Sequence, residues 1–233
     1  ADVLNKLGSK LEDLGLNSWQ LRTLFALKKC RTSALGGHID ACDECGNISI
    51  SYNSCRNRHC PKCQGRNRED WIQTRETELL PVPYFHVVFT LPEVLNKTAL
   101  HEPKMLYDTL FETAWETLQT FGKNKNLQMG MIAVLHTWGQ NLSLHPHLHC
   151  IVPGGGVDEN GAWKNIKNDG KFLFSVKALS KVFRAKFCEK LKANLKDKFN
   201  ENQENEYEKI RQSLWEKPWV VYAKKPFGSP KSV

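Results

Sequence analysis

Three histidines fall within the five residues from His145 to His149, and an apolar run that ends in three glycines follows directly. Because side chains alternate between the two faces of a β-strand, His147 and His149 project to one face while Leu148 and Cys150 project to the other. A pair of imidazoles opposite an apolar face is typical of metal ligands on a strand. The competing interpretation is a histidine-rich strand edge that forms only hydrogen bonds. We expect a strand that binds a metal ion.

A second strand is predicted over residues 131–138, immediately before the histidine strand. The link between them, residues 139–146, is short, and this favours an antiparallel pair. In such a pair, His136 returns beside His147 and His149 and completes a three-histidine site. Gln140 and His145 are rival third ligands.

Composition indicates a globular chain whose partner is a polyanion. The 233 residues, 40% of them hydrophobic, suffice for one large domain or two small ones, and the net charge of +8 favours nucleic acid. Charge alone also allows an anionic membrane surface or simple solubility. The sequence has neither an apolar run of membrane-spanning length nor a signal-peptide core, so we expect no membrane partner and a cytoplasmic location. The chain starts at Ala1, which is consistent with a fragment, and the oligomeric state cannot be inferred.

Six of the eight cysteines fall within a window of 34 residues. In a reducing compartment such clustering favours zinc over disulfides. Two Cys-x-x-Cys pairs separated by 14 residues predict one structural Zn²⁺ site, with the ligands Cys42, Cys45, Cys60 and Cys63. A second, interleaved Zn²⁺ site would use Cys30, His38, Cys55 and His59. The alternative for this second set is that its members pack near the first site without binding metal.

Basic residues accumulate between and after the second cysteine pair. No acidic residue interrupts them before Glu69, so they form a candidate DNA-binding platform that contacts phosphates. The platform residues are Arg56, Arg58, Lys62, Arg66 and Arg68. A solvated face without a ligand is the alternative.

The remaining pattern alternates helices and strands. Apolar spacing predicts a short helix over residues 3–14, a second that is capped by Asn17 or Ser18, and others over residues 66–80, 105–121 and 176–195. Strands are expected at residues 84–90 and 219–222, with a hairpin at 157–163. His86, within the first of these strands, is interpreted as a core or sheet residue rather than a ligand. Pro81 and Pro83 divide the chain into domains 1–80 and 81–233.

Four segments together resemble the rolling-circle insertion-sequence transposases. They are residues 52–63 around the second cysteine pair, Phe-Thr-Leu-Pro at 89–92, Trp-Gly-Gln at 138–140 and the histidine strand at 145–156. This group belongs to the HUH endonuclease superfamily, named for two histidines around one hydrophobic residue, here His147 and His149. The resemblance covers nearly the whole chain.

The resemblance implies an α+β fold in which a small zinc-binding domain precedes a nuclease domain with a central antiparallel sheet flanked by helices. It implies binding of single-stranded DNA at transposon ends, and a catalytic Mg²⁺ or Mn²⁺ that polarises the scissile phosphate. A tyrosine then attacks, leaving a 5′-phosphotyrosine and a free 3′-hydroxyl for strand transfer.

The family's tyrosine, or pair of tyrosines four residues apart on a helix, follows the histidine strand. This chain has no such pair, and only Tyr207 and Tyr222 follow the histidines. Tyr207 lies in an acidic stretch that would repel phosphate, and Tyr222 lies in a strand-like context. We therefore expect the nucleophile to lie beyond Val233 and the nuclease domain to be truncated at its C-terminus.

Two other classes of protein fit part of the pattern. A zinc-stabilised DNA-binding module without catalytic activity would keep its DNA affinity when His147 is substituted. A metal-dependent hydrolase of the barrel type would carry the histidine pair early, whereas only 84 residues follow His149 here. Other metallohydrolases need an acid just beyond the pair, where Cys150 stands.

Overall fold

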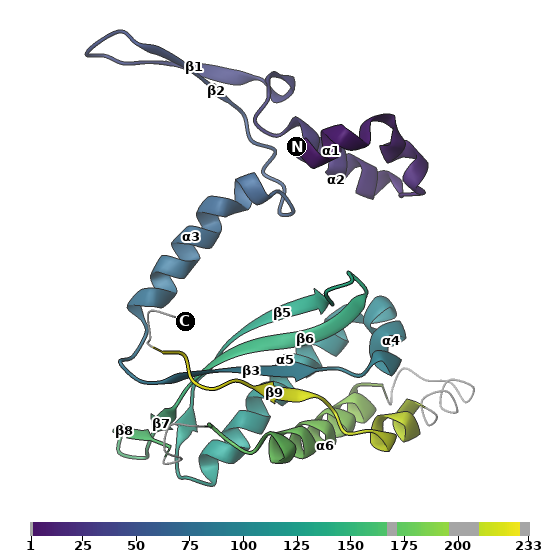
Figure 1. Cartoon of the computed structure of the whole chain (residues 1–233), viewed down its shortest axis with the longest axis vertical. Helices are drawn as coiled ribbons and strands as arrows, with labels where there is room; N and C mark the ends of the chain where they lie inside the picture. Colours follow the sequence, from purple (N-terminus) through teal and green to yellow (C-terminus); the bar gives the residue numbers. More distant parts are fainter. Residues whose placement is uncertain (1, 167–171, 196–209, 229–233) are drawn as a thin grey trace. The chain divides into compact units, whose positions relative to one another are not determined.

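The computed structural model describes residues 2–166, 172–195 and 210–228 (Figure 1). The chain divides into two compact units, residues 1–79 and 80–233. The division lies close to Pro81, and each unit is described by itself. None of the described helices is long and apolar enough to cross a membrane.

The helices that open the first unit lead directly to the first clustered cysteine. Helix α1 (Asp2–Leu7) continues as the 3₁₀ helix η1 (Gly8–Leu14), and α2 (Ser18–Lys29) follows. The Asn17 side chain accepts a hydrogen bond from the Gln20 N–H at 2.9 Å, and the Gln20 side chain accepts one from the Asn17 N–H at 2.9 Å. This reciprocal capping fixes the start of α2. The helix ends at Cys30, whose side chain is fully buried.

A two-stranded hairpin, which the sequence pattern did not predict, carries the first Cys-x-x-Cys pair in the connection between its strands. After η2 (Ser33–Leu35), strand β1 (Gly37–Ala41) pairs antiparallel with β2 (Ile48–Tyr52), and Cys42 and Cys45 lie in the connection between them. Helix α3 (Pro61–Thr77) then begins five residues earlier than predicted. Proline suits the first position of a helix because its missing N–H would have no helical partner there.

The second unit is built on a four-stranded sheet in the order β5-β6-β3-β9, with every pair antiparallel. This matches the predicted α+β class with a central antiparallel sheet. The strands are β3 (Tyr84–Thr90), β5 (Ile132–Trp138), β6 (Leu144–Pro153) and β9 (Val221–Ala223). A smaller sheet joins β4 (Gln128–Met129), β7 (Gly155–Val157) and β8 (Trp163–Asn165). The helical elements are η3 (Glu93–Leu95), α4 (Asn96–His101), α5 (Pro103–Lys123), α6 (Val176–Leu195) and the short helix at residues 210–216.

Helices α5 and α6 supply the core against one face of the large sheet (Figure 1). Phe89, Leu148 and Phe183 are completely buried there, and the Phe89 and Phe183 rings pack 4.9 Å apart between centroids. The alternate residues of β3 and β6 therefore face away from these helices. The histidines of the strand region lie on this second face.

The structure confirms the predicted strand 84–90, the helix 176–195 and the antiparallel pairing of residues 132–138 with the histidine strand. The last strand begins two residues later than expected, at Val221. The predicted hairpin at 157–163 is present as β7 paired with β8. Tyr207 lies outside the described residues.

Candidate metal centres

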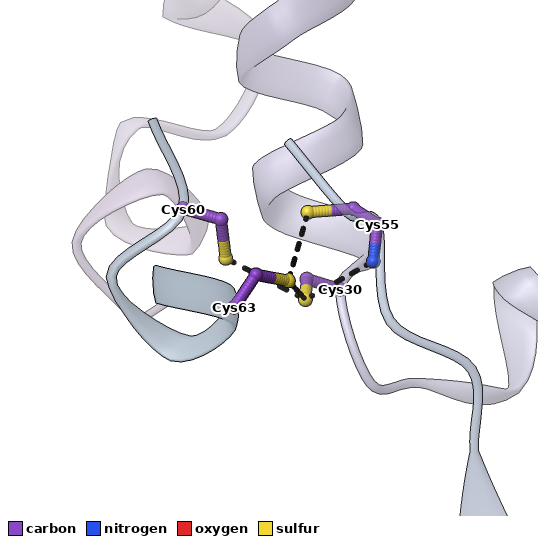
Figure 2. Close-up of side chains that lie close together, drawn as sticks. All are labelled: Cys30, Cys55, Cys60 and Cys63. Carbon is purple, nitrogen blue, oxygen red and sulfur yellow. Dashed lines mark hydrogen bonds between the residues drawn. The ribbon is translucent and has the colours of Figure 1, made fainter. Parts of the chain in front are cut away.

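Four cysteines from three segments of the first unit converge on one point (Figure 2). Cys30 ends α2, Cys55 follows β2, and Cys60 and Cys63 begin α3. The Cys63 sulfur lies 3.5 Å from that of Cys30 and 3.6 Å from that of Cys55, and the Cys60 sulfur lies 3.6 Å from that of Cys30. Four thiolates held about 2.3 Å from a tetrahedral zinc ion would place their sulfurs about 3.8 Å apart. The cluster thus has the dimensions of a four-thiolate zinc site.

The surroundings of the cluster favour a thiolate at Cys63. Burial opposes ionisation there, but hydrogen bonds from the Cys30, Cys55 and Cys60 thiols and from the Arg56 N–H outweigh it and lower the pKa of Cys63 to about 6. Burial raises the pKa of Cys55 to about 12. Cys63 also lies in the first turn of α3, where the helix dipole favours negative charge. A bound cation would draw the remaining thiols to the thiolate form.

The predicted grouping of cysteines is corrected by this geometry. Cys60 and Cys63 lie with Cys30 and Cys55, whereas Cys42 and Cys45 are exposed at the tip of the β1–β2 hairpin. Five ladder pairs separate that tip from the base of the hairpin, a length of about 14 Å at the usual rise of a strand. The ladder holds the tip away from the cluster. In the described part of the chain, neither Cys42 nor Cys45 belongs to a group of three metal-binding residues.

The predicted second set is corrected as well, because its two cysteines and two histidines do not meet. His38 lies in the β1–β2 ladder, with its Nε2 atom 3.7 Å from a carboxylate oxygen of Asp40. The His59 ring stands edge-on to Trp19, with centroids 6.2 Å apart. Neither histidine is part of the cysteine cluster.

The second candidate centre consists of His136, His147 and His149, each of which offers one ring nitrogen within 4.8 Å of those of the other two. His136 on β5 is the direct ladder partner of His147 on β6, and His149 follows two residues later on the same face. The structure thus brings together the three residues expected from the strand pairing. His145 is not part of the group.

Two of the three rings are held by hydrogen bonds at their Nδ1 atoms. The Nδ1 atom of His147 lies 2.6 Å from the backbone oxygen of His145, to which it donates as an N–H. The Nδ1 atom of His149 lies 2.7 Å from Nε2 of His86. Both bonds leave the Nε2 atoms of His147 and His149 available to a metal, which is the usual arrangement of metal-binding histidines. The donor set and its outer bonds fit a divalent cation.

The pKa values of His136, His149 and the adjacent His86 lie below the ordinary value, which favours the neutral form that binds metal. Partial burial, together with neighbouring His136, His147 and His86, lowers the pKa of His149 to about 4. Burial and then the proximity of His147 lower the pKa of His136. Burial, followed by the charge of Lys224, lowers the pKa of His86. At neutral pH these three imidazoles therefore carry no charge.

His86 is a sheet residue of β3 and is not part of the three-histidine group, as expected, but its contact with His149 was not predicted. The two rings stack with centroids 4.9 Å apart and an interplanar angle of 9°. Phe85 and Val87, its neighbours along β3, are buried in the core, so strand alternation alone places His86 on the histidine face.

All five predicted platform residues are exposed. Lys62, Arg66 and Arg68 lie on α3, and the Arg66 guanidinium lies 3.9 Å from Asp70. Arg56 lines a cavity of about 540 Å³. Arg31, which was not predicted as a platform residue, lines the same cavity.

Two family models match most of the chain. Residues 3–91 match the model described as "Transposase zinc-binding domain", and residues 130–233 match the model described as "Putative transposase". Over its full length the chain is 42% identical to "Putative transposase y4qJ" of Sinorhizobium fredii, and the match covers 62% of that protein. The chain belongs to this transposase family.

A second relative of the chain is the transposase for insertion sequence element IS801 of Pseudomonas savastanoi pv. phaseolicola. The two are 35% identical over 158 residues, which is 67% of this chain and 38% of the relative. The chain thus spans less than two thirds of either relative. Among solved structures, it is similar to the relaxase TrwC complexed with a 27-mer DNA, with a TM-score of 0.37 and 14% identity over 46% of this chain and 44% of that chain.

Proposed function

We propose that this transposase cleaves single-stranded DNA and transfers the strand through a 5′-phosphotyrosine, as in rolling-circle transposition at insertion-sequence ends. The observation that carries the proposal is the three-histidine centre on the sheet face opposite the core helices. Its imidazoles would hold Mg²⁺ or Mn²⁺, which when bound would polarise a phosphate oxygen and stabilise the charge that develops in the transition state. Zn²⁺ in the cysteine cluster would have a structural role.

In that reaction the histidines of this chain would hold the metal ion in a fixed position. His147 and His149 are fixed by their Nδ1 hydrogen bonds, and the β5–β6 ladder fixes His136 beside them. A rigid ligand set of this kind would hold the ion, and through it the phosphate, without reorganisation during the reaction. The basic platform on the first unit would bind backbone phosphates of the DNA.

Two tyrosines of the described strands, Tyr84 and Tyr222, lie on the histidine face of the sheet. Val88 pairs with His149 on one side and with Tyr222 on the other, so these three side chains share one face of the sheet. Two strand spacings, about 10 Å, lie between the backbones of His149 and Tyr222. Tyr84 instead accepts a hydrogen bond from the Leu80 N–H through its hydroxyl. A nucleophile beyond Val233 stays our prediction, and Tyr222 is its rival.

The test is incubation of the chain with 3′-end-labelled single-stranded oligonucleotides and Mn²⁺, followed by a denaturing gel. If Tyr222 attacks, the wild type forms a covalent protein–DNA adduct that both His149→Ala and Tyr222→Phe abolish. If the nucleophile is elsewhere, Tyr222→Phe behaves as the wild type, and a longer chain forms an adduct that depends on His149. Absence of metal-dependent cleavage or adduct with the longer chain as well would overturn the proposal and favour a DNA-binding module.

A further inference from the structure

Two arginines of the first unit have backbone conformations that are unfavourable for their side chains. Arg31 has φ +56° and Arg56 has φ +50°, both in the left-handed region. Each arginine directly follows a cysteine of the zinc cluster, Cys30 or Cys55. At Arg56 the conformation serves the cluster, because its N–H bonds to the Cys63 sulfur. Glycine would adopt this conformation without the steric cost of a Cβ atom.

The cost of a large side chain at these two positions suggests that the side chains themselves are used. Both line one cavity of about 540 Å³, a volume within the range of small-ligand sites. The cavity is lined by Arg31, His38, Tyr52, Asn53, Ser54 and Arg56. None of these is acidic, and neither arginine forms an ion pair with a described residue. The cavity is therefore electrostatically suited to an anion.

The walls of the cavity are fixed by the backbone. Asn53 accepts a hydrogen bond from the Arg31 N–H at 3.0 Å, donates its own N–H to the Gly36 oxygen at 3.0 Å, and donates its side-chain amide to the Leu35 oxygen at 3.0 Å. These bonds hold the segment after α2 against the end of β2. Together with the cysteine cluster, they fix the positions from which both guanidinium groups project.

Tyr52 adds an aromatic surface to the same cavity. Its side chain is 46% exposed. Gly37 is its ladder partner, and a Cβ atom added at Gly37 would lie 3.2 Å from the Tyr52 ring and 2.8 Å from the Ser51 oxygen. The glycine therefore leaves room for the ring to lie close to the backbone of β1. An exposed aromatic ring beside two guanidinium groups is the combination that binds unpaired bases together with their phosphates.

We propose that this cavity binds one nucleotide unit of single-stranded DNA, with its phosphate between Arg31 and Arg56 and its base on the Tyr52 ring. The proposal rests on the proposed function, because it assumes that single-stranded DNA is the ligand of this chain. The cavity would be a second binding site, in addition to the platform residues on α3. Unlike those residues, it offers a flat contact that accepts any base. Phosphates alone would contact the arginines but would not use Tyr52.

The test measures the affinity of the zinc-loaded chain for a labelled twelve-residue oligo(dT) and for an abasic oligomer of the same length. Arg31→Gly and Arg56→Gly should each weaken oligo(dT) binding about tenfold and reduce the slope of log K against log salt by about 0.7. Their melting temperatures and zinc contents should not fall, since glycine relieves the left-handed backbone. Arg22→Gln is the charge-matched control, because Arg22 is exposed on α2 outside the cavity, and its affinity should stay within about twofold of the wild type.

Tyr52→Ala should weaken oligo(dT) binding about tenfold and leave binding of the abasic oligomer unchanged, while Tyr52→Phe keeps both affinities. Equal loss of both ligands in Tyr52→Ala would overturn the base contact. If Arg31→Gly and Tyr52→Ala bind oligo(dT) as tightly as the wild type while Lys62→Ala or Arg68→Ala bind it more weakly, the chain binds DNA but not in this cavity. That result would overturn the proposed nucleotide site. A wild-type chain that binds neither oligomer would overturn the cavity together with the DNA-binding part of the proposed function.

Discussion

His86 should control the metal affinity of the histidine centre without being a ligand itself. Its Nε2 atom lies 2.7 Å from Nδ1 of His149, and the two rings stack. His86→Phe keeps a ring of similar size against His149 but removes the hydrogen-bond acceptor. The His149 imidazole is then free to rotate and to change tautomer, so its Nε2 atom is less often available to the metal.

Loss of such an outer hydrogen bond typically costs about 10-fold to 100-fold in metal affinity. This corresponds to about 1.4 to 2.7 kcal/mol of binding free energy. We expect His86→Phe to fall within this range and His149→Ala to lose more. Mn²⁺ is the suitable probe, because it prefers nitrogen and oxygen ligands and binds the thiolates of the cysteine cluster only weakly. Isothermal titration or the electron paramagnetic resonance signal of free Mn²⁺ gives the affinity.

His145→Ala is the matched control. The hydrogen bond of His147 is to the backbone oxygen of His145, which alanine keeps, so the substitution removes only the ring contact between the two residues. The control should therefore bind Mn²⁺ as the wild type does. Unchanged affinity in His86→Phe, at a melting temperature equal to that of the wild type, would refute the reasoning about the outer bond. A loss in His145→Ala as large as that in His136→Ala would instead reassign the third ligand.

Two further outcomes follow from the geometry. Cys55→Ala should abolish zinc binding at the cluster and unfold the first unit, whereas a Cys42→Ala, Cys45→Ala double variant should keep the cluster zinc. Metal analysis after gel filtration distinguishes the two variants. The reverse result would favour the ligand set predicted from the sequence. The hydrogen bonds from Lys164, at 2.6 Å, and from the Ala162 N–H lower the pKa of Asp158. The contribution of Asp158 to the free energy of unfolding is therefore present above the ordinary carboxyl pKa and is lost as the pH falls through the lowered pKa of Asp158. Thermal unfolding should show Asp158→Asn less stable than the wild type at pH 7 and equal to it in strong acid; a difference that persists in acid would contradict this.

The histidine centre could be predicted from the sequence because its geometry follows from strand periodicity. A link too short for a crossover required β5 and β6 to pair antiparallel, and the two-residue period then placed His147 and His149 on one face. The same rule applied to β3 would have placed His86 there as well. The expectation of a residue that is not a ligand was correct, but the hydrogen bond of His86 to His149 was not predicted, because it depends on the pairing of β3 with β6, which lie far apart in the sequence.

The sequence predicted a four-cysteine metal site but not which four cysteines form it. Spacing identified Cys60 and Cys63 as a pair of ligands, but it could not show which other pair they meet. That choice depends on the β1–β2 hairpin, whose exposed strands carry only a weak apolar pattern, and on left-handed turns at Arg31 and Arg56. Sequence periodicity does not encode such turns when the residue is arginine, because glycine and asparagine are the usual signals.

The two centres differ in how far the fold around them depends on metal. In the second unit the histidine strand is anchored by a core of buried aromatic and aliphatic residues, so that sheet persists without a cation. In the first unit the described side chains that are buried are those of Cys30 and Cys60, both of them cluster residues. A unit of this size without an apolar core needs its metal to fold. A strong zinc chelator should therefore remove hydrogen-exchange protection from residues 1–79 and leave it in β3, β6 and α5; retained protection in α2 and α3 would show that the first unit has another source of stability.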